Sequence, residues 1–180
     1  MIDNEKYGVV FGGGGAKGAY EIGVWKALNE LKIPVGVVVG TSVGALNGAI
    51  MVQGDFDVAC TMWNDLTMSK IFDFGEEKDV LAQNSLSLTS IISTIKNSLR
   101  SGGMDVTPLK ELLYKVIDEK KIRESKIDFG IVTFSLTDFK PVNIFKKDIP
   151  EGKLIDYLLA SSCFPTFKPH MIDNKRFVDG

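Results

Sequence analysis

VVVGTSVGALNGAI, at residues 37–50, lies within a stretch without any charged side chain that runs from Ile33 to Gly54. That stretch is about long enough to cross a lipid bilayer. Four of its glycines recur at four-residue spacing, which resembles the small-residue seam of packed membrane helices. These glycines are Gly36, Gly40, Gly44 and Gly48. The same letters also fit a short β-strand, a sharp turn and a helix, and the choice between the two interpretations decides the fold.

A membrane-spanning helix is the weaker of the two interpretations. Such a helix would contain Pro34, Asn47 and the four glycines. Each glycine costs about 1 kcal/mol relative to alanine in a helix interior. No Trp or Tyr marks either end of the stretch, and no cluster of Lys or Arg lies just outside it. The β-branched run Val35–Val39 instead predicts a strand, followed by a helix from Ser42 to about Met51.

The same alternation of strand and helix begins earlier in the chain. Tyr7–Phe11 is a short apolar run that ends in four glycines, which predicts a buried strand entering a tight loop. Between Gly18 and Leu31, the residues Ile22, Trp25 and Leu28 form a helical stripe. Strand, helix, strand and helix in succession predict an α/β fold with a mostly parallel central sheet flanked by helices.

Helices dominate the prediction for residues 55–125, and strands return after them. One apolar stripe lies at Leu88–Leu99 and another at Leu109–Ile117, where Thr107 and Pro108 provide signals for the start of a helix. The remaining expected elements are strands at Ile127–Phe134, Val142–Phe145 and Arg176–Val178 and a helix at Leu154–Ser161. No repeat or linker interrupts this order, so we expect residues 1–180 to form a single domain.

Composition narrows the classes of function. The net charge of −2 gives no reason to expect nucleic-acid binding. Cys60 and Cys163 lie far apart without metal-site spacing, so we expect free thiols in a reducing compartment and a cytoplasmic protein. The N-terminus is acidic and polar before it turns apolar, which is the wrong order for a secretory signal. His170 is the only histidine, so any histidine-dependent catalytic or metal site would rest on this one residue.

Ser42 is the first candidate for chemistry. Gly40-Thr41-Ser42-Val43-Gly44 is a Gly-x-Ser-x-Gly sequence, which in hydrolases places a nucleophilic serine on a strained turn between a strand and a helix. Gly40 and Gly44 stand where the strand and helix backbones nearly touch. At the start of a helix, unpaired backbone N–H groups favour developing negative charge. From the pentapeptide alone, a plain helix N-cap is an open alternative for Ser42.

A run of glycines after the first expected strand is the second candidate. Gly12–Gly15 are followed by Ala16-Lys17-Gly18, where the next helix opens. Acyl transfer needs backbone N–H groups aimed at an oxyanion, and a glycine run supplies them without interfering side chains. The run also fits a dinucleotide-binding fingerprint, but Gly40 and Thr41 stand where that fold needs an acidic residue. A phosphate-binding P-loop would need Ser or Thr directly after Lys17.

Three motifs in this order resemble the patatin-like phospholipase family. They are Gly-Gly-Gly-Ala-Lys-Gly at residues 13–18, Gly-Thr-Ser-Val-Gly at residues 40–44 and Asp-Gly at residues 179–180. AYEIGVWKAL at residues 19–28 and ASSCFPTF at residues 160–167 add to the resemblance, which is weakest from about residue 60 to 125. The resemblance implies a patatin-like three-layer α/β sandwich.

The resemblance also implies a catalytic dyad of Ser42 and Asp179 that needs no histidine. The implied oxyanion hole consists of three backbone positions, Gly13, Gly14 and Gly15. The other motif positions are Lys17, Gly18, Gly40, Gly44 and Gly180. The implied activity is hydrolysis of lipid or small acyl esters, as in a phospholipase, lysophospholipase or esterase, through a covalent acyl-serine. The resemblance implies no metal or organic cofactor, and it implies peripheral contact with a membrane or micelle surface.

The residues themselves are compatible with such a dyad. Asp179 would accept the Ser42 proton during attack on the carbonyl carbon. Because a carboxylate is a weak base for an alcohol, the glycine loop must provide more of the stabilisation of the transition state. His170 stands in the loop-like sequence Lys-Pro-His-Met, where we expect a surface or packing role. For the helix at Leu88–Leu99, with the preceding segment Met68–Phe74, we favour packing in the core over a lid or acyl-chain wall.

The chain stops one residue after Asp179, so we expect it to be the N-terminal part of a longer protein. Missing strands would leave a sheet edge uncovered and Asp179 near a fraying terminus. A homodimer that covers this edge is a consequence that we expect. The alternative function is a non-catalytic patatin-like module that binds lipid or a partner without turnover.

Overall fold

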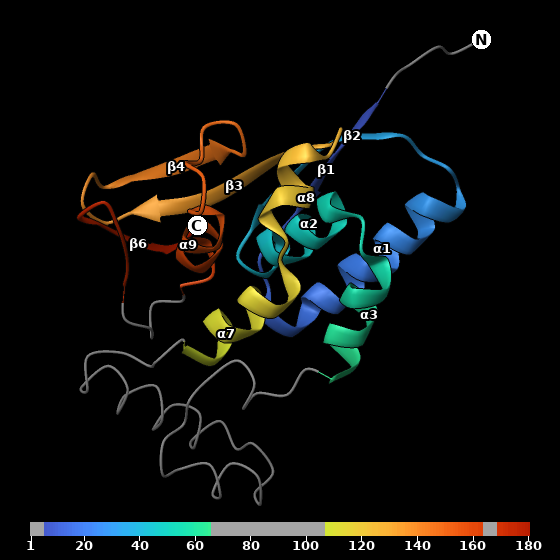
Figure 1. The fold of residues 1–180 in the computed structure, drawn as a ribbon, viewed down its shortest axis with the longest axis horizontal. Helices are drawn as coiled ribbons and strands as arrows, with labels where there is room; N and C mark the ends of the chain where they lie inside the picture. Colours follow the sequence, from blue (N-terminus) through green and yellow to red (C-terminus); the bar gives the residue numbers. More distant parts are fainter. Residues whose placement is uncertain (1–5, 66–106, 164–168) are drawn as a thin grey trace, which may run out of the picture.

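The computed structural model describes residues 6–65, 107–163 and 169–180, which form a six-stranded mixed sheet with helices packed against it (Figure 1). The expected α/β class is confirmed. Three of the sheet's strands are parallel neighbours, and the other three extend the sheet with antiparallel pairs. The expected helix at Leu88–Leu99 and the segment Met68–Phe74 lie outside the described residues.

The first half of the chain has the expected alternation of strand and helix. Its elements are β1 (Tyr7–Phe11), the 3-10 helix η1 (Gly15–Lys17), α1 (Gly18–Glu30), β2 (Val35–Thr41), α2 (Val43–Gln53) and α3 (Phe56–Asp65). The uncharged stretch is therefore divided between β2 and α2, and the alternative of one membrane-spanning helix is wrong. Within the ranges that the structure describes, none of the helices combines the length and apolar character needed to cross a bilayer.

The second half contains the elements that complete the sheet. They are α7 (Thr107–Val116), α8 (Glu119–Glu124), β3 (Asp128–Ser135), β4 (Lys140–Phe145), α9 (Leu154–Ser161), β5 (His170–Ile172) and β6 (Lys175–Asp179). Most follow the expected ranges closely. The loop-like assignment of His170 is wrong, because His170 begins β5 and lies opposite Phe177 of β6. A three-residue strand is too short to show a period in the sequence, and its pairing with β6 determines its conformation.

The topology around β3 brings two distant parts of the chain together. β4 pairs along one edge of β3, opposite residues 130–135. β2 and β6 must therefore share the other edge, where β2 runs opposite residues 128–132 and β6 opposite residues 133–135. β2 is parallel to β3 and β6 is antiparallel to it, so their C-terminal ends meet head to head. Thr41 lies opposite Val132 and Asp179 lies opposite the next residue, Thr133.

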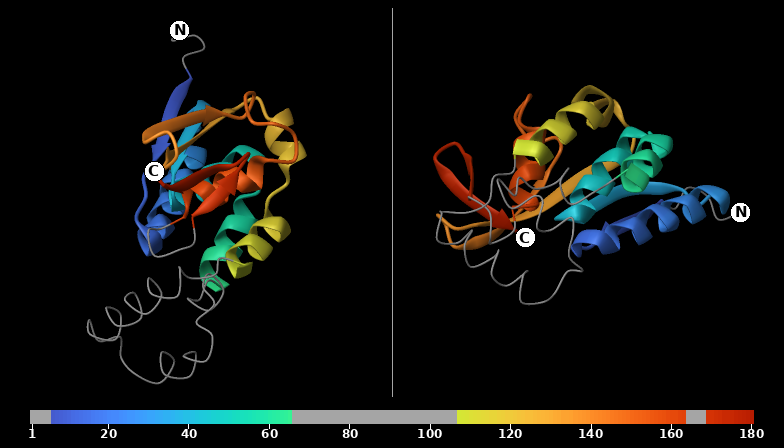
Figure 2. Two further views of the ribbon diagram at one scale, coloured as in Figure 1. Left: turned by 90° about the vertical axis from the view of Figure 1, so that its left-hand side faces the viewer. Right: turned by 90° about the horizontal axis from the view of Figure 1, so that it is seen from below.

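Helix α2 is the centre of the hydrophobic core. Its residues from Gly44 to Val52 are all buried, as expected for a helix that is apolar all round. α2 packs against β1, β2 and β3, while α9 packs against β3, β5 and β6. α1 and α3 pack against α2, and the right-hand view in Figure 2 shows them at the opposite end of the molecule from the red β5–β6 hairpin.

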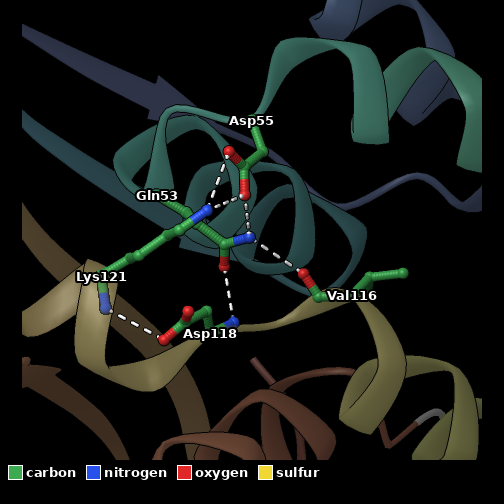
Figure 3. Close-up of polar contacts among 5 residues, drawn as sticks. All are labelled: Gln53, Asp55, Val116, Asp118 and Lys121. Carbon is green, nitrogen blue, oxygen red and sulfur yellow. Dashed lines mark hydrogen bonds and ion pairs between the residues drawn. The ribbon is translucent and has the colours of Figure 1, made fainter.

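The C-terminal end of α2 is fastened to the connection between α7 and α8 by one side chain, Gln53 (Figure 3). Its amide nitrogen donates to Asp55 Oδ2 at 2.6 Å and to the Val116 carbonyl at 3.0 Å. Its amide oxygen accepts from the Asp118 backbone N–H at 2.7 Å. Lys121 completes the cluster through an ion pair with Asp55 at 3.0 Å. This network fixes the end of α2 that lies away from Ser42.

Candidate active site

Ser42 occupies a strained bend between β2 and α2. Its φ of 54° and ψ of −131° lie in a region that residues with a side chain rarely adopt. The glycines on either side of Ser42 are required because there is no room for a side chain at their positions. A Cβ on Gly40 would lie 2.5 Å from the Ala45 nitrogen, and a Cβ on Gly44 would lie 2.6 Å from the Phe11 carbonyl carbon. The three backbones of β1, β2 and α2 therefore meet around Ser42 without room for side chains.

The Ser42 hydroxyl points to the C-terminal end of β6. It donates a hydrogen bond to Asp179 Oδ2 at 2.7 Å, across a sequence separation of 137 residues. Ser42 stands at the N-cap position of α2, but its side chain makes no capping hydrogen bond. The plain N-cap, which the sequence left open, is therefore not the role of this side chain.

Asp179 is held at the end of β6 by hydrogen bonds of the surrounding backbone. Its N–H donates to the Cys163 carbonyl at 2.7 Å, and the Thr133 hydroxyl donates to the Val178 carbonyl at 2.8 Å. Burial raises the pKa of Asp179, and hydrogen bonds from Ser42 and the Gly180 backbone partly offset this rise. A Cβ on Gly180 would lie 2.7 Å from the Val132 carbonyl oxygen, so the residue after Asp179 also has to be small.

The glycine loop between β1 and α1 lies beside Ser42. A Cβ on Gly13 would lie 3.2 Å from Ser42 Cβ and 3.9 Å from Ser42 Oγ. Gly14 and Gly15 have positive φ values of 154° and 55°, and both are exposed. Lys17 is exposed, and its N–H donates to the Gly14 carbonyl at 3.2 Å. An ester carbonyl at Ser42 would thus be next to an open backbone segment without side chains.

A buried polar network fixes the far end of this loop to α2. A Cβ on Gly18 would lie 2.7 Å from Val43 Cγ2, so α1 starts in close contact with the helix that follows Ser42. The fully buried Asn47 donates to the Gly18 carbonyl at 2.9 Å and to Glu21 Oε2 at 2.7 Å. Its amide oxygen accepts from the Trp63 indole at 2.9 Å. The glycine loop leads into α1 and Ser42 leads into α2, and these hydrogen bonds hold the two helices together.

His170 belongs to a different cluster from Ser42 and Asp179. Its Nε2 lies 3.2 Å from Asp156 Oδ1 of α9, and 17% of its side chain is exposed. Burial lowers the pKa of His170, and the contact with Asp156 partly offsets this shift. Among the described residues, its ring has no hydrogen bond to Ser42 or Asp179. From the sequence we expected a surface or packing role for His170, and its mostly buried side chain agrees with packing.

Ser161, which no sequence pattern singled out, contacts the bend with its side chain. Ser161 Oγ accepts a hydrogen bond from the Ser42 backbone N–H at 2.9 Å and donates one to the Val132 carbonyl at 2.6 Å. The signal in the sequence was a serine directly after the apolar run Leu158–Ala160, and the structure shows that this serine is fully buried. Sequence spacing alone does not show what such a hydroxyl contacts.

Comparison with known proteins gives a consistent family. The family model described as Patatin-like phospholipase matches residues 9–180. A 51-residue segment, 28% of this chain, is 53% identical to Lysophospholipase nte1 of Aspergillus terreus. A 49-residue segment, 27% of this chain, is 58% identical to Neuropathy target esterase sws of Drosophila melanogaster. Each segment spans only 3% of the length of that curated relative.

The fold also resembles a solved structure, VipD from Legionella pneumophila. The superposition has a TM-score of 0.65 and covers 98% of this chain and 46% of that one. At 18% sequence identity, this likeness concerns the fold alone. The family match, in contrast, spans the glycine loop, the Ser42 bend and Asp179 in one continuous range. The chain belongs to the patatin-like phospholipase family.

Proposed function

We propose that this chain hydrolyses acyl esters of lipids, with Ser42 as nucleophile and Asp179 as general base. The observation that carries the proposal is the 2.7 Å hydrogen bond from the Ser42 hydroxyl to Asp179 Oδ2. A serine hydroxyl becomes reactive when a base within hydrogen-bonding distance accepts its proton. Membership of the patatin-like phospholipase family supports lipid esters as the substrate class.

In the acylation step, Ser42 Oγ attacks the ester carbonyl carbon while its proton passes to Asp179. The carbonyl oxygen becomes an oxyanion, for which we propose the backbone N–H groups of Gly13, Gly14 and Gly15 as donors. Collapse of this tetrahedral intermediate breaks the ester C–O bond. The alcohol leaves with the proton held by Asp179, and the acyl group stays on Ser42.

In the deacylation step, Asp179 acts as base toward water. The water oxygen attacks the acyl-serine carbonyl carbon as its proton passes to Asp179, and the glycine loop again faces the oxyanion. The Ser42 oxygen leaves and recovers its proton from Asp179, which releases the fatty acid and restores the starting state. The raised pKa of Asp179 makes it a stronger base than an exposed aspartate, which helps both steps.

Hydrolysis of a short p-nitrophenyl ester tests the assignment directly. Ser42→Ala removes the nucleophile and Asp179→Asn removes the base, so each should lower kcat/KM by about a thousandfold or more. Circular dichroism should show that both variants remain folded. Full activity of either folded variant would refute the dyad.

His170→Ala is the matched control for this experiment. His170 pairs with Asp156 rather than with Ser42, so its removal should leave kcat/KM within about twofold. A loss as large as that of Asp179→Asn would show that a histidine takes part. If the folded wild-type protein binds lipid vesicles without turnover of any ester, the non-catalytic module becomes the better description.

A further inference from the structure

Ser161 links the Ser42 bend to the strand that pairs with Asp179. It is the last residue of α9 and is fully buried. Its hydroxyl donates its one hydrogen bond to the Val132 carbonyl at 2.6 Å and accepts a hydrogen bond from the Ser42 N–H at 2.9 Å. Val132 immediately precedes Thr133, which lies opposite Asp179. One hydroxyl thus connects the nucleophile's backbone to the junction where β2 and β6 meet.

The bend needs such a link because its conformation is unfavourable. A residue with a side chain at such a positive φ is unfavourable and persists only where its surroundings fix it. The steric contacts of Gly40 and Gly44 hold the segments on either side of Ser42. The hydrogen bond that the Ser42 N–H donates to Ser161 Oγ holds Ser42 itself, at the peptide group that a rotation of its backbone would move.

We infer that Ser161 is a positioning residue for the reaction, which keeps the Ser42 backbone in the orientation that directs the hydroxyl to Asp179. The inference rests on the proposed hydrolase function. It has a consequence for the oxyanion hole as well. In some serine hydrolases the nucleophile's own N–H stabilises the oxyanion. Here that N–H already donates to Ser161 Oγ, so stabilisation of the oxyanion depends on the N–H groups of the glycine loop.

The neighbouring residue provides a matched control for Ser161. Ser162 Oγ is also buried, and within the described residues it has no hydrogen-bond partner. Ser161→Ala and Ser162→Ala therefore delete the same atom at adjacent positions, but only the first breaks bonds to Ser42 and Val132. A third variant, Ser161→Cys, keeps the side-chain size with a poor donor and covers the case in which Ser161→Ala does not fold.

The first readout is kinetic. Ser161→Ala and Ser161→Cys should lower kcat for a p-nitrophenyl ester by about tenfold to a hundredfold, because a misplaced nucleophile loses its alignment with the carbonyl carbon. KM should stay within about twofold, and Ser162→Ala should match the wild type. Folded Ser161 variants with the kcat of Ser162→Ala would overturn the inference, as would an equal loss in all three variants.

The second readout does not depend on turnover. Amide hydrogen exchange followed by NMR should be at least about tenfold faster at the Ser42 N–H in Ser161→Ala than in Ser162→Ala, because the exchanging proton has lost its acceptor. Unchanged exchange at Ser42 would overturn the inference even in an active enzyme. A wild-type protein without esterase activity but with this exchange difference would refute the proposed function and retain the Ser161–Ser42 link.

Discussion

The two ends of helix α2 are held in contrasting ways. At the N-terminal end, Gly40 and Gly44 bring backbones into direct contact, and Ser42 is strained and gives its side chain to Asp179 instead of capping the helix. At the C-terminal end, Gly54 adopts the left-handed conformation with φ 87°, and its N–H donates to the Ile50 and Met51 carbonyls. Gln53 adds the side-chain network of Figure 3.

The C-terminal end of α2 contributes to stability, whereas the N-terminal end carries the candidate reaction site. The C-terminal end uses a common helix cap and satisfied hydrogen bonds, which stabilise the fold locally. The N-terminal end gives up the side-chain cap, which typically contributes about 1 kcal/mol, and carries backbone strain as well. Strain concentrated beside a candidate nucleophile agrees with a site shaped for reaction rather than for stability. Four experiments test this contrast.

The largest effect should come from Gly40→Ala. Its new Cβ would meet the backbone of Gly44 and Ala45, which cannot move away as a flexible side chain can. We expect a loss of about 3 kcal/mol or more in the free energy of unfolding, measured by urea denaturation. Gly54→Ala is the control, since its Cβ has open space and only the positive φ opposes it, at about 1 kcal/mol. Equal losses at both sites would contradict the steric account.

A smaller effect should follow from Gln53→Ala. The substitution leaves the Val116 carbonyl, the Asp118 N–H and Asp55 without the amide that now bonds to them. We expect about 1–2 kcal/mol less stability in the same denaturation experiment. Ester hydrolysis per folded molecule should not change, because the site lies at the other end of α2. A kcat reduced in proportion to stability would show that the two ends are coupled.

A comparison of Ser42→Gly with Ser42→Ala isolates the backbone strain at the bend. Both variants lose the hydroxyl and its bond to Asp179, so that part of the change cancels. Glycine accepts the positive φ and is also the better N-cap residue, so Ser42→Gly should be more stable than Ser42→Ala by about 1–2 kcal/mol. Two melting temperatures measured side by side decide this, and equal values would mean that the bend stores no strain.

The pKa values of two carboxyl groups near the ends of α2 are shifted in opposite directions. Burial raises the pKa of Asp179, so hydrolysis should fail on the acid side at a pH above the ordinary aspartate value of about 3.9. Hydrogen bonds from Gln53 and then Lys121 lower the pKa of Asp55. The stabilisation by Asp55 is therefore present above the ordinary aspartate pKa and is lost only as the pH falls through its lowered value.

The protein should consequently pass through an acidic range in which it is folded but inactive. A pH profile of kcat/KM, measured beside near-ultraviolet circular dichroism, would show activity falling before the signal of the folded state. An acid limb at or below the ordinary aspartate pKa, or one that coincides with unfolding, would contradict the proposed role of Asp179.

Much of the fold was predictable because it rests on local patterns. The β-branched run before Gly40 and the stripe of Ile22, Trp25 and Leu28 predict their elements from periodicity, and the structure confirms them. β5 was missed because three residues carry no period, and the pairing of β6 with β3 joins two strands that have β4, α9 and β5 between them in the sequence. The head-to-head meeting of β2 and β6 follows from strand order, which short-range patterns do not encode.

The candidate site divides in the same way. The structure brings Gly13, Ser42 and Asp179 together, as the three motifs led us to expect. The contacts of Ser161 and Asn47 were not predictable, because a buried serine or asparagine in an apolar helix shows only that a partner must exist. Which atom is the partner depends on how α9 and α1 pack against α2.

The most direct test of the central claim is covalent labelling of the folded wild-type protein with a fluorophosphonate, followed by peptide mass spectrometry. The reagent reacts with serines that a neighbouring base activates. We expect one label per chain, located at Ser42, and strongly slowed labelling in Asp179→Asn. A folded protein that takes up no label, or that carries it on another serine, would contradict the assignment of Ser42 as an activated nucleophile.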